Sequence, residues 1–179
     1  MPRPAILKWR DMNLPRTVLL LAKPIPLPAV QAVASAALRA LLKKHPKLFD
    51  RLGEHAAKTF AFAPTDIPFA FAVAPLLGTI TVTRPGRVLR ADATISGPLV
   101  LLLAVAEGRV DGDAEFFARE LSITGDMEAV LALRNAIDDC GIDLPSDLAP
   151  SRGPLRRPVE ASLQAFRTLM LSRGSRKWS

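Results

Sequence analysis

The sequence feature that most constrains the fold is a switch to two-residue alternation of apolar side chains. Four successive segments show it: TFAFA (59–63), PFAFAVA (68–74), GTITVT (78–83) and VLRADATI (88–95). This period is typical of strands that pack one face against a core. The connections are short and rich in Pro and Gly, which predicts an antiparallel meander with one face exposed to water on the last two strands.

Helical periodicity surrounds these strands. Pro28 suits the first turn of a helix that ends at His45–Pro46. Its apolar positions are Val30, Val33, Ala34, Ala37, Leu38 and Leu41, with Gln31, Ser35 and Arg39 elsewhere. A short helix carrying Leu48, Phe49 and Leu52 follows it. After the fourth strand we expect a helix over 97–107, a strand near 119–124 and a helix over 126–139. Asp126 is the expected N-cap of this last helix.

These elements predict an α/β (α+β) fold in which helices cover a mostly antiparallel five-stranded sheet. Five prolines make residues 1–27 an extended basic lead-in. The domain then spans 28–142, and a Pro/Ser/Arg-rich linker spans 143–157. A basic amphipathic helix and tail occupy 158–179.

The charge is distributed unevenly along the chain, although the net charge is only +7. Residues 1–58 hold eleven Lys/Arg and three Asp/Glu, residues 59–150 hold six and thirteen, and residues 151–179 hold seven and one. The basic ends indicate contact with an anionic membrane surface, nucleic acid or an acidic partner. Alternatively, they are solvated and pair with the acidic middle. Nucleic acid is not expected, because only Trp9 and Trp178 accompany the basic ends as stacking residues.

The sequence contains few residues or motifs that are typical of catalytic sites. His45 and His55 are the only histidines, and neither has metal-ligand spacing with the single cysteine, Cys140. Nucleophile-elbow, dinucleotide and phosphate-loop motifs are absent. We therefore expect no enzyme activity, no metal and no cofactor. The apolar runs are too short for a membrane span, so we expect a cytoplasmic protein. Peripheral association with the inner membrane is compatible with that expectation.

The C-terminal segment has an apolar stripe at steps of four, three and four, formed by Val159, Leu163, Phe166 and Met170. Basic residues surround that stripe. Such a helix docks on its own domain or lies in a membrane interface, and the pattern leaves both open. The residues expected to make a membrane or partner contact are Arg156, Arg157, Leu163, Phe166, Arg167, Met170 and Arg173.

The helix expected over 97–107 is apolar on nearly every face, unlike an ordinary surface helix. Its outer side is covered by another element, by a partner protein or by a ligand. Strand faces with segregated large and small apolar residues can leave a cavity instead of a filled core, and ligand pockets are mostly apolar. The pattern leaves open whether the chain's own terminal helices fill this space or whether the domain is a ligand container, and a scaffold module that docks a partner on this helix is a further alternative.

The segment ADATISGPLVLLLAVAEGRVDGDAEFFARELSITGDMEAVLALRNAID resembles the sterol-carrier-protein type 2 lipid-binding family over about residues 58–139. The resemblance implies a hydrophobic tunnel for an isoprenoid or acyl chain. Within this family, the residues of this segment and the basic extensions on either side most resemble accessory factors of oxygen-independent ubiquinone biosynthesis. That similarity implies ubiquinone or a prenylated precursor as ligand, presented to ubiquinone-biosynthesis proteins that include iron–sulfur hydroxylases.

In such a container the helix after Gly125–Asp126 forms a wall, with Met127, Val130, Leu131 and Ile137 facing an apolar interior. The expected lipid-binding residues are Phe60, Phe62, Phe69, Phe71, Ile80, Val82, Leu99, Leu102, Leu103, Phe116, Phe117, Leu121, Ile123, Met127, Val130 and Leu131.

Overall fold

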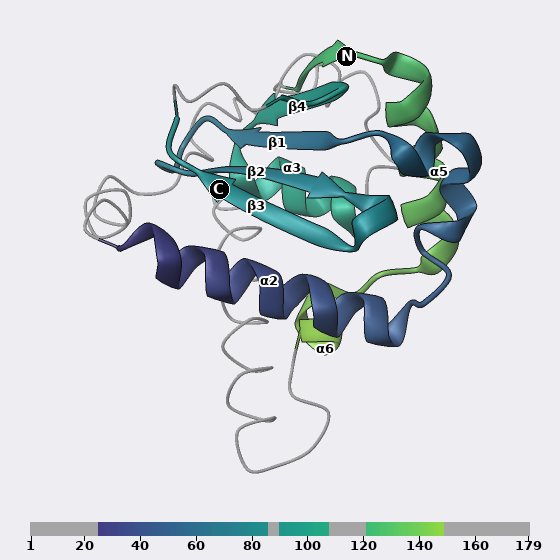
Figure 1. The fold of residues 1–179 in the computed structure, drawn as a ribbon, viewed down its shortest axis with the longest axis horizontal. Coiled ribbons are helices and arrows are strands. Elements are labelled where there is room, and N and C mark those ends of the chain that lie inside the picture. The colour runs from purple at the N-terminus through teal and green to yellow at the C-terminus, as the bar shows by residue number, and fades with distance from the viewer. Residues whose placement is uncertain (1–24, 86–89, 108–120, 149–179) are drawn as a thin grey trace, which may run out of the picture.

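The computed structural model describes residues 25–85, 90–107 and 121–148 (Figure 1). Its strands are β1 (Phe60–Pro64), β2 (Ala70–Ala74), β3 (Thr79–Thr83), β4 (Ala93–Gly97) and β5 (Ser122–Gly125). Its α-helices are α2 (Leu27–Lys44), α3 (Leu99–Ala106), α5 (Met127–Cys140) and α6 (Leu144–Leu148), and its 3-10 helices are η2 (Asp50–Ala57) and η3 (Pro75–Leu77). The strands form one sheet, and α2 runs along its β3 edge (Figure 1).

The sheet is mixed, with strand order β3-β2-β1-β4-β5. The meander holds for β1 to β3, which pair antiparallel, but β4 crosses over and pairs in parallel with β1. The prediction of a mostly antiparallel sheet is therefore wrong at its centre. Alternation shows which side of a strand is apolar but not which strand becomes its neighbour, so the crossover had no local signal.

The register aligns apolar side chains in two rows across the sheet, because paired residues point to the same face. The first row is Ile80, Val73, Phe60 and Ala93, and it ends at Gly125. The second row is Val82, Phe71, Phe62, Ile95 and Ile123. We call these two rows the phenylalanine face. The opposite face carries small and polar residues in register, among them Ala61, Ala72, Thr81, Thr94 and Thr124.

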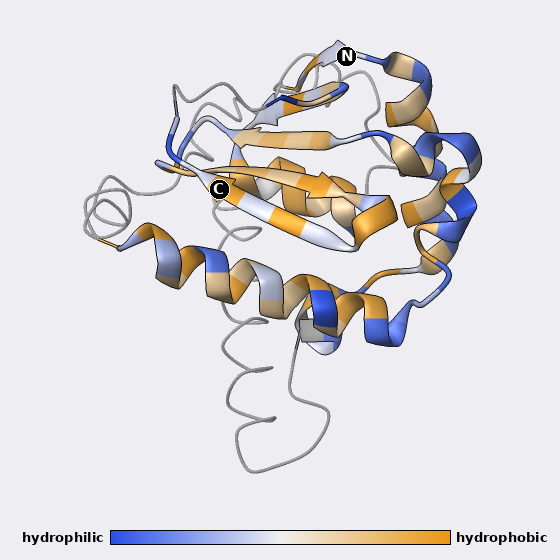
Figure 2. Ribbon diagram, viewed as in Figure 1, coloured by the Kyte–Doolittle hydropathy of each residue, from blue (hydrophilic) through white to orange (hydrophobic). Residues whose placement is uncertain are grey.

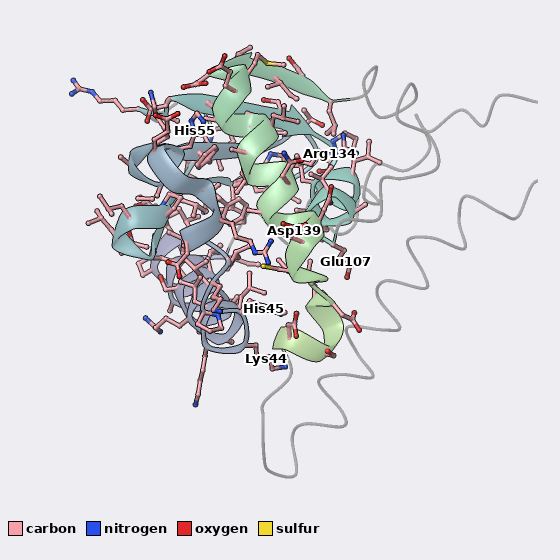
Figure 3. All side chains as sticks on the ribbon, turned by 90° about the vertical axis from the view of Figure 1, so that its right-hand side faces the viewer. Lys44, His45, His55, Glu107, Arg134 and Asp139 are labelled. Carbon is pink, nitrogen blue, oxygen red and sulfur yellow. The ribbon has the colours of Figure 1, made fainter. Side chains whose placement is uncertain are left out.

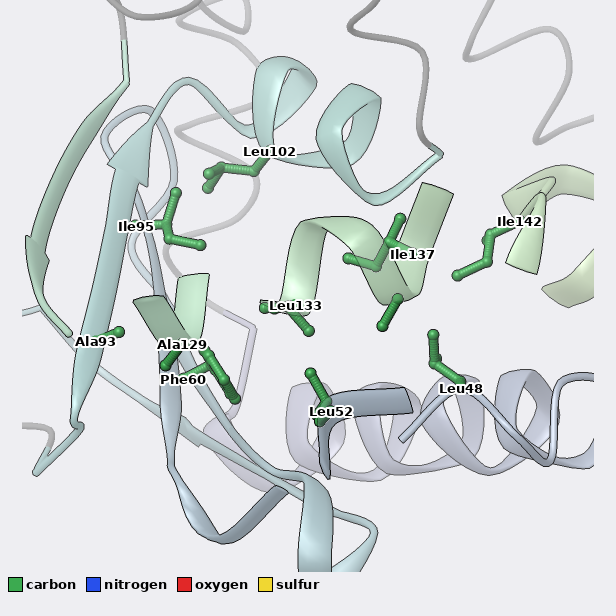
Figure 4. Packing of buried hydrophobic residues seen from close by; sticks show 11 residues of the cluster. Leu48, Leu52, Phe60, Ala93, Ile95, Leu102, Ala129, Leu133, Ile137 and Ile142 are labelled. Carbon is green, nitrogen blue, oxygen red and sulfur yellow. The ribbon is translucent and has the colours of Figure 1, made fainter. Parts of the chain in front are cut away.

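The hydrophobic core lies between the phenylalanine face and the helices. Phe60 and Ile95 point from the sheet toward Leu133 of α5, Leu52 of η2 and Leu102 of α3 (Figure 4). Phe60 and Leu52 are 1% and 2% exposed. Hydropathy colouring shows β1 and β2 as mainly apolar and β3 as an alternation of apolar and near-neutral residues (Figure 2).

Helix α2 begins where the sequence predicts, with Pro28 in its first turn, and His45 is its C-cap. Its inward face differs from the expected one. Val33 is 70% exposed, whereas Gln31 is half-buried against β3. The Gln31 amide donates to the Ile80 carbonyl oxygen at 2.7 Å and accepts from the Val82 N–H at 2.7 Å. These backbone groups lie at the free edge of β3, so the side chain acts as a substitute strand partner there.

Helix α5 begins at the predicted cap, since the Asp126 carboxylate accepts from the Ala129 N–H at 3.0 Å. Its inward face carries Ala129, Leu133, Ala136 and Ile137. The prediction that Met127 and Leu131 also face the interior is wrong, because each is 58% exposed. The helical phase places these two residues on the outer side, and the apolar run from Ala129 to Leu133 concealed that phase in the sequence.

Ion pairs join the α2–η2 segment to α5 and α6. Lys58 lies 3.3 Å from Asp126, and Arg51 pairs with Asp139, which lies on α5 (Figure 3). Asp147 of α6 is buried and lies 2.8 Å from His45. Within the described residues, the stretch from Lys44 to Lys58 thus pairs with the acidic middle, as one of the two alternatives expected, while most of both basic ends lies outside the described residues.

Helix α6 occupies the first part of the segment predicted as a linker. Lys44 also contributes to its docking, because its ammonium donates to the Ser146 carbonyl oxygen and lies 3.7 Å from Asp147. The Pro- and Ser-rich composition of the segment concealed this helix. Across the described ranges, no helix is both long and apolar enough to cross a bilayer.

Candidate functional site

The phenylalanine face is covered unevenly. At the first row, Phe60 and Ala93 are each 1% exposed. In the second row Val82 and Ile95 are buried, yet the two rings between them, Phe62 and Phe71, are only half-buried. A central residue of a covered sheet face stays accessible only where the covering layer is incomplete above it. The face therefore has a closed part near Phe60 and a more accessible part over Phe62 and Phe71.

Helix α3 lies over the same core. Each of its residues is apolar, and Leu102 packs beside Ile95 (Figure 4). Leu101 and Leu102 are 2% and 6% exposed, and the other side chains described for α3 are half-buried. The outer side of this helix is thus at least partly covered, as its composition required.

Asp66, which is far from α3 in the sequence, fixes the position of the helix N-terminus through a direct hydrogen bond. This carboxylate, 5% exposed, lies in the loop between β1 and β2 and accepts from the Leu99 N–H at 2.8 Å. Thr65 in the same loop donates its N–H to the Gly97 carbonyl oxygen at 2.9 Å. A buried carboxylate at a helix N-terminus satisfies exposed backbone donors and complements the helix dipole. The loop therefore holds the α3 end of the site at a defined position.

Arg84 lies at the open end of the β2–β3 hairpin, where β2 begins and β3 ends. Its guanidinium lies 4.6 Å from the centre of the Phe69 ring and donates to the Ile25 carbonyl oxygen at 2.8 Å. It also donates to the Pro68 carbonyl oxygen at 3.4 Å. Phe69, expected at the lipid site, is thus buried beneath a cation.

The β5–α5 junction is tied to the sheet by Asp92. The Asp126 N–H donates to the Asp92 carbonyl oxygen at 2.9 Å, and the Asp92 carboxylate accepts from the Thr59 N–H at 2.7 Å. The hydrogen bond from the Ala129 N–H, together with the Lys58 ammonium, lowers the pKa of the Asp126 carboxyl below its usual range. The cap is therefore ionised over the whole neutral range.

The predicted lipid-binding residues fall into four groups. The buried ones are Phe60, Phe69, Val82 and Leu102. The half-buried ones are Phe62, Phe71, Ile80, Leu99, Leu103, Leu121 and Val130. The exposed ones are Ile123, Met127 and Leu131. Phe116 and Phe117 lie outside the described residues, as do the predicted contact residues from Arg156 to Arg173.

Three residues that shape the site had no role in the sequence analysis: Gln31, Asp66 and Arg84. Each acts on a backbone group at least 16 residues away, the shortest separation being that from Arg84 to Pro68. The only signal was an isolated polar residue within or beside an apolar run, and that signal is common in loops and helix faces. Among the described residues no group of three or more His, Cys, Asp or Glu could hold a metal ion.

Similar solved structures include a UbiJ-SCP2 ubiquinone synthesis protein, 19% identical with a TM-score of 0.51, in a match that covers 66% of this chain and 98% of that one. A sterol carrier protein 2 from Yarrowia lipolytica is 11% identical, with a TM-score of 0.43 and coverage of 64% and 94%. Sterol carrier protein domain 2 of Helicoverpa armigera is 16% identical, with a TM-score of 0.41 and coverage of 58% and 83%.

No curated protein sequence matches this chain. Residues 38–138, more than half of the chain, match the SCP-2 sterol transfer family. The matched range runs from the middle of α2 to the last turn of α5 and so contains both rows of the phenylalanine face. The chain therefore belongs to the SCP-2 sterol transfer family.

Proposed function

We propose that the protein is a non-catalytic carrier of a prenyl lipid, either ubiquinone or one of its prenylated precursors. The observation that carries the proposal is the accessibility of Phe62 and Phe71 between the buried Val82 and Ile95. In our proposal an isoprenoid tail lies over these two rings and under α3. Membership of a sterol transfer family and the fold shared with a ubiquinone synthesis protein support a lipid of this class.

The finer proposal is that the carrier serves oxygen-independent ubiquinone biosynthesis. The chain resembles UbiT, the accessory factor of that pathway, in the block from about residue 58 to 139 and in its basic extensions. The resemblance implies presentation of the lipid to iron–sulfur hydroxylases in the cytoplasm, near the inner membrane. The residues from Arg156 to Arg173 stay our candidates for membrane or partner contact.

The energetics favour reversible delivery. Each CH₂ group removed from water contributes about 0.8 kcal/mol, so a prenyl tail has a large gross driving force for leaving water. The tail is taken from a bilayer, however, which is already an apolar phase. Net affinity is then set by packing against the phenylalanine face, and we expect exchange with vesicles to be fast and incomplete.

Native mass spectrometry after incubation with vesicles that contain ubiquinone tests the proposal. We expect one lipid per protein in the intact chain. Phe71→Gln should reduce occupancy on the order of tenfold, because it places an amide without a partner against the tail. Thr81→Gln is the matched control, since Thr81 is exposed on the opposite face of the neighbouring strand. Failure of the intact chain to acquire any prenyl lipid would overturn the proposal.

The biosynthetic role needs a separate test. In a host whose own UbiT gene is deleted, expression of this chain should restore ubiquinone synthesis, and it should do so during growth without oxygen. Recovery in air alone would contradict the oxygen-independent role and leave lipid binding intact. The scaffold alternative has less support, because none of the described side chains of α3 is exposed for docking a partner.

A further inference from the structure

The turn between β2 and β3 carries an unusual apolar tip. Leu76 and Leu77 of η3 are 72% and 74% exposed, the highest values among the large apolar side chains described. Isolated exposed apolar residues are common on protein surfaces, but two adjacent leucines at the end of a hairpin form a protruding patch. The phenylalanine face does not use them, so the proposed lipid site leaves this tip unexplained.

The tip is held in place by the backbone around it. Pro75 is buried and begins η3, and Gly78 ends it with φ of 59° and an N–H that donates to the Pro75 carbonyl oxygen at 2.9 Å. A Cβ atom added at Gly78 would lie 3.6 Å from Leu42 Cδ1, so the turn packs against the last turn of α2. The two leucines therefore project from a fixed turn and lose little backbone entropy on binding.

The surroundings of the tip are basic. The η3 turn contacts η2 as well as the end of α2 (Figure 1). From Arg39 to Lys58 the chain holds six Lys/Arg and two Asp/Glu, and three of these cations, Lys44, Arg51 and Lys58, pair with Asp147, Asp139 and Asp126. Lys43 and Lys47 are exposed and form no ion pair with the described residues. In Figure 2 the apolar turn stands beside the polar end of α2.

We propose that Leu76 and Leu77, with Lys43 and Lys47, form a docking surface for an anionic phospholipid bilayer. The leucines enter the boundary between headgroups and acyl chains, and the ammonium groups meet the lipid phosphates. The positive charge beside an apolar tip selects this occupant over an apolar protein groove, which would leave the lysines without partners. The proposal deepens the proposed function, since a carrier that draws lipid from a bilayer must meet one, but docking itself requires no bound lipid.

Vesicle sedimentation of the full chain tests the docking surface. We expect binding to phosphatidylcholine–phosphatidylglycerol vesicles, and much weaker binding to phosphatidylcholine alone. Leu76→Ser with Leu77→Ser should weaken binding by more than about tenfold, because two apolar side chains no longer insert. Met127→Ser with Leu131→Ser is the matched control, since it removes two exposed apolar residues from α5 and should leave binding unchanged.

The charge contribution is tested with Lys43→Gln and Lys47→Gln, each expected to weaken binding about fivefold at low salt and much less in concentrated salt. Arg90→Gln is the control, because Arg90 is an exposed cation just before β4, and β1 separates β4 from the β2–β3 hairpin in the sheet. Circular dichroism verifies that each variant is folded. Equal vesicle binding by the leucine variant and the intact chain would overturn the proposal, as would equal losses in the leucine variant and its α5 control.

The two proposals fail in different ways. Loss of vesicle docking with ubiquinone occupancy unchanged in detergent solution is the result expected of the leucine variant. An intact chain that docks on anionic vesicles but never acquires ubiquinone would refute the proposed cargo and support the docking surface. An intact chain that acquires ubiquinone from detergent but does not bind anionic vesicles would support the proposed cargo and refute the docking surface.

Discussion

Replacement of Gly125 by alanine should destabilise the fold more than replacement of any other described glycine with positive φ. Gly125 has φ of 91°, a conformation that side-chain-bearing residues rarely adopt. An added Cβ would also collide with the backbone carbonyl oxygen of Asp92. That oxygen cannot move freely, because it accepts from the Asp126 N–H at 2.9 Å and belongs to the residue that pairs with Thr59.

The magnitude follows from two contributions. Backbone strain at such a position costs about 1–3 kcal/mol, and forcing extra volume against fixed backbone costs about as much again. We therefore expect Gly125→Ala to lower the free energy of unfolding by about 4 kcal/mol, which for a chain of this size lowers the Tm by roughly 10 °C. Urea denaturation followed by circular dichroism measures the free energy, and a thermal scan measures the Tm.

Gly141→Ala is the matched control. Gly141 has φ of 58° at the end of α5, and an added Cβ there meets nothing within 4 Å. Only the left-handed backbone contributes, so the expected loss is about 1 kcal/mol. Equal losses in the two variants would refute the collision with Asp92. A loss below about 1 kcal/mol in Gly125→Ala would refute the strain as well.

Three further predictions follow from polar contacts. Gln31→Ala leaves two edge groups of β3 without their partner and should lower the unfolding free energy by about 2 kcal/mol in urea denaturation, whereas no loss would mean that water replaces the amide. Asp126 stabilises above its unfolded-state pKa, so stability measured across an acid series should fall as pH drops through its lowered folded-state pKa. In Asp126→Asn this slope should be shallower, and an unchanged slope would contradict the assignment. Asp147→Ala should release α6, raising amide hydrogen exchange in residues 144–148 while α5 stays protected.

Much of the local structure could be predicted from the sequence. Alternation placed Phe60 and Phe62 on one side of their strand, and the register shows that Phe71 of β2 lies opposite Phe62 on the same face of the sheet. Pro28, His45 and Asp126 marked helix ends correctly because caps and proline act within one turn. These signals are local, and each is a property of residues that are neighbours in the chain.

The candidate site was less predictable, because it depends on how that face is covered. The sequence could not distinguish Phe60, which the helices seal, from Phe62, which they leave half-exposed. It also could not show that Met127 and Leu131 point outward. In an apolar stretch every helical phase looks similar, and only the position of the sheet relative to the helix selects one.

The sequence by itself determined the approximate places of the strands, the helix ends, the all-apolar α3 and the family resemblance. Tertiary structure alone decided the parallel pairing of β1 with β4, the Gln31 contact with the edge of β3 and the exposure of the η3 leucines. The division has one physical reason. Propensity, capping and alternation act over a few residues, whereas neighbour choice and burial depend on groups brought together from 33 to 51 positions apart.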